Sequence, residues 1–107
     1  MSRSIFHTQT QKSLDEMMPV IKEILNQDGY HEIERNGEAL WKKGTGAMTA
    51  MHFIKIDYVP GDLIISGFVQ IGLGSVGLNE MDLTGVSGKI PKKSTFQTIQ
   101  KIRKAIL

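Results

Sequence analysis

The sequence of 107 residues contains no cysteine, and this absence excludes several kinds of site. Disulfides, thiolate nucleophiles and zinc sites with cysteine ligands cannot form. A chain without cysteine is compatible with a reducing compartment. The fold must therefore rest on its apolar core, and a chain of this length buries roughly two thirds of the surface that it exposes when unfolded.

Long apolar runs are also missing from the sequence. The first residues lack the apolar stretch of a signal peptide. No window approaches the ~20 apolar residues of a membrane-spanning helix. We expect one cytoplasmic domain over residues 1–107, in which residues 1–9 form a loosely ordered arm.

Acidic residues are absent from the last part of the chain. Residues 1–88 hold all eleven acids and seven cations, whereas residues 89–107 hold six cations and no acid. Such a segment can contact an anionic partner, although cations near a helix C-terminus also complement the helix dipole in a purely solvated face. The candidate contacts are Lys89, Lys92, Lys93, Lys101, Arg103 and Lys104.

Complete catalytic, cofactor or metal motifs are not found. Residues 72–77 read Gly-Leu-Gly-Ser-Val-Gly, which matches the dinucleotide-binding pattern, but no periodic helix follows and no acid stands ~20 residues further on. The three histidines are scattered without helical zinc spacing. We interpret His52 as a hydrogen-bonded core or edge residue. The sequence therefore predicts no catalytic, cofactor-binding or metal-binding residue.

Period-two alternation over residues 51–71 predicts two strands joined at Pro60-Gly61. Proline and glycine suit the two central positions of a type II turn. Pairing outward from this turn places Ile56 opposite Ile65 on one face. On the other face, Phe53 lies opposite Phe68.

Two helices and further strands flank this hairpin. A stripe of apolar residues predicts a helix over about residues 10–28, with a Ser13 capping box, Gly29 after its end and a kink or restart at Pro19. Asn-Gly at 36–37 predicts a second hairpin from strands at 30–35 and 38–43. A fifth, irregular strand is expected within residues 80–90.

The last helix is predicted to begin after Pro91. Ser94 and Gln97 form a possible capping box in the sequence. The buried stripe of this helix is predicted to consist of Phe96, Ile99, Ile102 and Ile106.

These elements predict an α+β fold, with a five-stranded antiparallel meander and both helices packed on one face. The second face then carries Phe53, Ile64 and Phe68. Aromatic rings on an otherwise polar face are costly to leave in water, so these three residues form a candidate self-association surface. The alternative is that sheet curvature and the N-terminal arm cover them within one chain.

The segments LWKKGTG at 40–46, MTA at 48–50 and FIKI at 53–56 resemble a domain of short uncharacterised bacterial proteins. GVSGKIPKK at 85–93 and the closing basic helix are similar as well. The resemblance covers about residues 14–107, and it implies no assigned activity. Relatives with a zinc ribbon before this domain would differ from this chain, which has no cysteine.

The leading functional hypothesis is a small non-enzymatic intracellular binding module that can self-associate. The first alternative is binding of nucleic acid or another anionic surface through the basic end. The second is a small enzyme whose site lies between the sheet and the helices. Their discriminating feature is a deep polar pocket, which only the enzyme requires.

Overall fold

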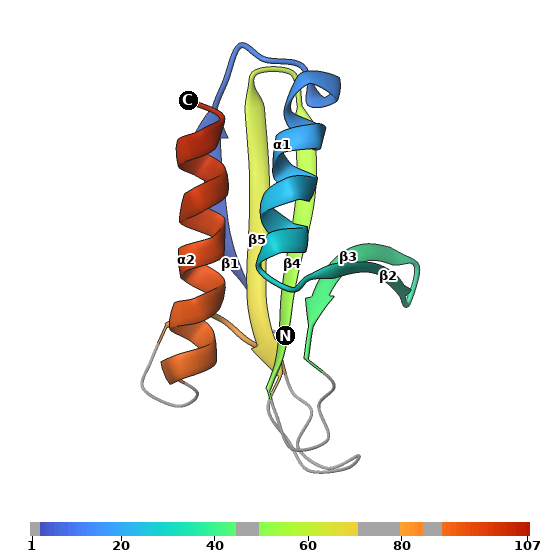
Figure 1. Ribbon diagram of the computed structural model, residues 1–107, viewed down its shortest axis with the longest axis vertical. Coiled ribbons are helices and arrows are strands. Elements are labelled where there is room, and N and C mark those ends of the chain that lie inside the picture. The colour runs from blue at the N-terminus through green and yellow to red at the C-terminus, as the bar shows by residue number, and fades with distance from the viewer. Residues whose placement is uncertain (1–2, 45–49, 71–79, 85–88) are drawn as a thin grey trace.

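The computed structural model describes residues 3–44, 50–70, 80–84 and 89–107 (Figure 1). These residues form an α+β fold with an antiparallel sheet and two helices. The elements are β1 (Ser4–Gln9), α1 (Leu14–Gln27), β2 (His31–Arg35), β3 (Glu38–Lys43), β4 (Met51–Val59), β5 (Asp62–Gln70), β6 (Glu80–Met81) and α2 (Lys89–Ala105).

The sheet has the strand order β1-β5-β4-β3-β2, and β6 also pairs with β5. The meander from β2 to β5 agrees with the sequence prediction. The central hairpin has the predicted register, with Ile56 opposite Ile65 and Phe53 opposite Phe68. Gly61 has φ +92°, as the second central residue of a type II turn requires.

Within the segment 1–9, which was expected to form a loose arm, residues 4–9 are instead a regular strand. Ser4–Gln9 form the strand β1, which pairs with β5 from Ser4 opposite Gly67 to Gln9 opposite Asp62. Alternation explains the strand, because Phe6 packs against the core while Ile5 and His7 are exposed. The structure therefore adds a strand before the first helix.

Helix α1 has the predicted capping box and C-terminal glycine, but it begins at Leu14 rather than near residue 10. The Ser13 hydroxyl accepts from the Glu16 amide, and the Glu16 carboxylate accepts from the Ser13 amide, which completes the capping box. Gly29 follows the helix with φ +91°. The helix does not restart at Pro19 but continues from Leu14 to Gln27. Neither helix in the described part of the chain combines the length and apolar character that crossing a membrane requires.

The β2–β3 hairpin turns at Asn36-Gly37, where both residues have positive φ. β3 pairs with β4 only over residues 41–43, opposite residues 52–54. Figure 1 shows the rest of this hairpin curving away from the long strands β4 and β5. The curvature places the β2–β3 residues over one end of the second sheet face.

The C-terminal part of the chain differs from the prediction in two respects. α2 begins at Lys89, so Pro91 lies in its first turn, where a missing amide hydrogen costs no hydrogen bond, and Ser94 lies inside the helix rather than at its cap. Among the described residues of the fifth predicted strand, only Glu80 and Met81 form a strand, β6, and Lys89 and Ile90 are helical. Residues 85–88 lie outside the described residues.

Both helices pack on one face of the sheet, as Figure 1 shows. The core there contains Met17, Ile21 and Leu25 of α1 and Ile99, Ile102 and Ile106 of α2. Buried side chains of β4 and β5 complete it, among them Ile54, Leu63 and Ile65. Gly67 lets α2 approach the sheet closely, because a Cβ atom there would lie 2.6 Å from Ile99 Cδ1.

Candidate functional site

The aromatic end of the second sheet face is covered by the chain itself. The rings of Phe53 and Phe68 stack with centroids 4.8 Å apart and an interplanar angle of 9°. The Arg3 guanidinium lies 4.2 Å from the Phe68 centroid, and the Arg35 guanidinium lies 4.8 Å from the Phe53 centroid. The two rings therefore have a cation over each member of the pair, and both are 0% exposed.

Arg3 is held in place by two carboxylates. Its Nη1 and Nη2 donate to Glu38 at 2.8 and 2.9 Å, and its Nε and Nη2 donate to Glu80 at 2.9 Å each. Lys55 Nζ also donates to Glu38, at 3.1 Å. The hydrogen bonds from Arg3 and then from Lys55 lower the pKa of Glu38 from 4.5 to about 2. This network joins the start of β1 to β3, β4 and β6.

The candidate self-association face is thus occupied within one chain. Leu40, Met51 and the partly buried Ile33 pack against the two rings, and Ile64 is half-buried. The sequence also allowed an alternative, in which sheet curvature and the N-terminal segment cover these residues within one chain. The contacts that Phe53 and Phe68 make agree with this alternative. These two rings are not available as a bare surface for a second copy of the chain.

The cations of the basic segment have different environments. Lys92 is 6% exposed and donates to the Thr84 carbonyl, so it cannot contact an anionic partner as predicted. Lys101 donates to both Asp28 oxygens, at 3.0 and 3.1 Å. Arg103 Nε donates to Thr8 Oγ1 at 2.9 Å. Only Lys93 and Lys104 are exposed without an ion pair among the described residues, and the side chain of Lys89 lies outside them.

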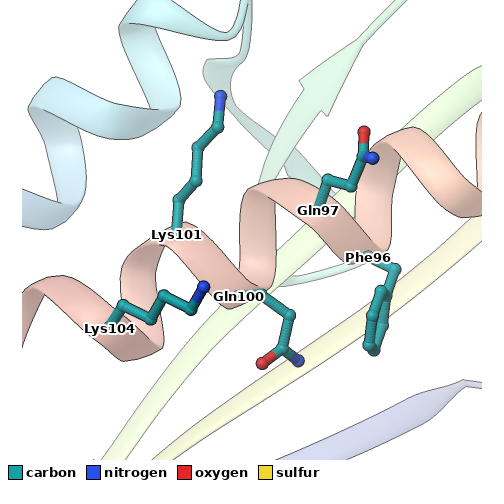
Figure 2. Close-up of a pocket in the computed structure, with 5 residues that line it drawn as sticks. All are labelled: Phe96, Gln97, Gln100, Lys101 and Lys104. Carbon is teal, nitrogen blue, oxygen red and sulfur yellow. The ribbon is translucent and has the colours of Figure 1, made fainter.

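The outward face of α2 carries a hollow with a largely apolar lining. A hollow of about 480 Å³ is lined by Phe96, Gln97, Gln100, Lys101 and Lys104 (Figure 2). Phe96 is 42% exposed, contrary to its predicted place in the buried stripe. Its ring packs on Phe6 of β1 with centroids 5.8 Å apart. Thr95 takes the buried position instead, because the helix turns its small side chain toward Gly67.

A polar cluster lies where α1 ends beside α2. Asp28 accepts from Thr98 Oγ1 at 2.6 Å and from Lys101. Burial raises the pKa of Asp28, but the hydrogen bonds from Thr98 and Lys101 together lower it by more than burial raises it. The net shift of this pKa is downward. An open hollow of about 320 Å³ here is lined by Gln27, Asp28, Lys43, Ser94, Gln97, Thr98 and Lys101. This hollow is polar but open, whereas the enzyme hypothesis requires a deep polar pocket.

Polar groups between the sheet and α2 serve the packing of this helix. His52 Nδ1 lies 3.0 Å from Thr95 Oγ1, as expected for a hydrogen-bonded core histidine, and burial lowers the pKa of His52. Thr95 is 0% exposed, and its hydroxyl donates to the Pro91 carbonyl inside α2. Burial raises the pKa of Tyr30 to about 12, so the phenol stays protonated. A hydroxyl that is buried and bonded to its own helix is poorly placed to attack a substrate.

Sequence reasoning missed Arg3 and the exposure of Phe96. The sequence offers no clear signal for Arg3, because the only apolar residues of segment 3–9, Ile5 and Phe6, are neighbours and do not alternate as in a half-buried strand. No described group of His, Asp and Glu residues has the geometry of a metal site. The Gly72 to Gly77 motif lies outside the described residues.

Comparisons with known proteins gave no match, whether with family models, with curated proteins or with solved structures. The resemblance to short uncharacterised bacterial proteins therefore stays a prediction.

Proposed function

We propose that this chain is a small non-enzymatic binding module of the cytoplasm that contacts a protein partner through the outward face of α2. One observation carries the proposal. The hollow on this face joins a partly exposed aromatic ring, Phe96, to the exposed cation Lys104 in a segment without acids. Aromatic side chains are enriched at protein contact surfaces, and positive charge favours a partner that carries acidic groups.

The charge of the segment favours an acidic protein over nucleic acid. Polyanion binding requires several cations that face the same way and release counterions together. In the described part of the segment, Lys92, Lys101 and Arg103 already make contacts within the chain. Only Lys93 and Lys104 of the described cations in this segment are left to bind a partner. Two cations favour a local contact with one or two carboxylates over binding along a row of phosphates.

Site-specific photocrosslinking tests the proposal. A photoreactive amino acid at Gln100, which lines the hollow, should crosslink a defined partner in cell extract. The same group at Val20, which is 38% exposed on α1, should not. The double variant Phe96→Ser with Lys104→Glu should abolish the crosslink from position 100.

A matched control uses the other helix. Val20→Ser with Lys22→Glu removes an exposed apolar group and reverses an exposed cation on α1, and it should leave the crosslink intact. Thermal melting of both double variants verifies that they are folded. Equal crosslinking from positions 20 and 100, or a crosslink that survives the Phe96 and Lys104 changes, would refute the proposal.

A further inference from the structure

β1 lies at one end of the sheet, with β5 as its neighbour on one side. No described strand pairs with its other side. Such an edge presents main-chain donors and acceptors to any extended chain that can reach it. β1 has six residues, which is long enough to pair with a short peptide segment.

Two hydrogen bonds determine which residues face this edge. The Thr10 amide donates to the Gly61 carbonyl. The amides and carbonyls of the even-numbered residues in this segment therefore point toward β5. The His7 carbonyl instead accepts from Arg103 Nη2 of α2 at 3.5 Å. Because bonding alternates along an antiparallel strand, the amides and carbonyls of Ile5, His7 and Gln9 point outward.

The side chains beside this edge carry positive charge on the side of α2. Arg103 lies next to β1 through its bonds to Thr8 and His7, and these use two of the five N–H donors of a guanidinium. A hollow of about 160 Å³ lies there, lined by Thr8, Gln100, Arg103, Lys104 and Leu107. On the opposite face of the strand, Ile5 is 58% exposed.

We propose that β1 accepts an extended acidic peptide as an added strand, with carboxylates of the peptide bonded to Arg103 and Lys104. This deepens the proposed function, because it names the class of partner and its binding mode, and it rests on the same face of α2. Side chains of the added strand alternate between two faces. Acidic residues face α2, and apolar residues between them lie against Ile5. Main-chain pairing supplies affinity and the two cations supply selectivity.

A second copy of the chain fits this edge less well than an acidic peptide. Antiparallel pairing of two β1 strands about a twofold axis would place both α2 helices on the same side of the joined sheet. Arg103 and Lys104 of each copy would then meet across the seam, and residues 89–107 contain no acid to offset them. Like charges opposed in this way disfavour the contact.

The unmodified protein provides the first test. The probe is a capped peptide of about eight residues that alternates Glu and Val, and its comparator alternates Lys and Val. Amide hydrogen exchange by NMR should slow at Ile5, His7 and Gln9 when the acidic probe is added. Exchange at Ser4, Phe6 and Thr8 should stay unchanged, since these amides already face β5. The lysine comparator should have no effect.

His7→Pro is the sharpest variant. It removes an amide that points outward, so the pairing of β1 with β5 is retained, and proline is tolerated at edge positions of this kind. We expect it to weaken binding of the acidic probe by about tenfold or more. His7→Ala removes the imidazole and keeps the amide, so it should bind as the parent does. Melting curves verify that both variants fold.

The outcomes separate this inference from the proposed function. If the acidic probe binds equally to the parent and to His7→Pro, and the alternating exchange pattern is absent, strand addition is wrong while an α2 contact stands. If the probe does not bind the parent at all, the acidic-peptide inference is overturned, and the crosslink from position 100 still tests the proposed function independently. Equal binding of the acidic and lysine probes would overturn the role given to Arg103 and Lys104.

Discussion

At Gly67 α2 lies close to the sheet, and replacing this glycine with alanine tests that packing. A Cβ atom at this position would lie 2.6 Å from Ile99 Cδ1, 3.0 Å from Leu83 Cδ1 and 3.5 Å from Thr95 Cγ2. The first distance is shorter than carbon atoms tolerate. Ile99 is 0% exposed, so its terminal methyl group has little free space into which it can move.

The expected magnitude follows from two opposing effects. Overpacking a core by one methyl group costs about 1–3 kcal/mol. Alanine also restricts the unfolded chain more than glycine does, which returns about 0.4–1 kcal/mol. Gly67→Ala should therefore lower the free energy of unfolding by about 1 kcal/mol. Ile99→Val alone removes the clashing methyl group and should cost about 0.5–1.5 kcal/mol.

The double variant identifies the cause. In Gly67→Ala with Ile99→Val, the new methyl group occupies part of the space that Cδ1 vacates. The double variant should therefore be more stable than the sum of the single effects predicts, by at least about 0.5 kcal/mol. Urea unfolding followed by circular dichroism measures all four proteins. Strict additivity, or a Gly67→Ala protein as stable as the parent, would refute the close approach of α2 to β5.

Three further predictions concern the second face and the basic segment. Arg3 and Lys55 lower the pKa of Glu38 from 4.5 to about 2. The contribution of the Glu38 carboxylate to stability is therefore complete above about pH 4.5 and is lost as the pH falls toward 2. The difference in urea midpoint between the parent and Glu38→Gln should shrink over that range. Phe68→Ala should cost about 3–5 kcal/mol of stability because its ring is buried within the chain, and equal stability with a changed sedimentation coefficient would instead favour a dimer contact. Binding of nucleic acid should be weak at physiological salt; micromolar, salt-sensitive binding abolished by Lys93→Glu with Lys104→Glu would favour the nucleic-acid alternative.

The parts of the fold that local chemistry determines could be predicted from the sequence. Asn36-Gly37 and Pro60-Gly61 determine two turns, and once a turn is placed the period of two determines the register of its strands. Ser13 and Glu16 likewise fix where α1 begins. Each of these signals lies within a few residues of the structure that it specifies.

The residues that were misplaced depend on contacts between distant segments. β1 is short, and its strand forms because β5, more than fifty residues later, has an edge to pair with. Phe96 has the apolar character of a core residue, but Thr95 fits the space above Gly67, and Phe96 rests on Phe6 instead. Helical periodicity alone could not choose between two neighbouring positions, because the choice depends on the shape of the sheet beneath.

The charged residues on the two sides of the sheet differ in whether they are already paired within the chain, and this difference bears on function. On the second face, Arg3, Glu38, Lys55 and Glu80 pair with one another, and the aromatic rings beneath them are covered. An ion pair that is satisfied internally gains little from a new partner, because the partner must replace bonds that already exist. On α2, Lys104 is exposed in a segment without acids, and Phe96 is partly uncovered beside it. The proposed acidic partner would therefore reach Lys104 without displacing a carboxylate that is already bonded to it.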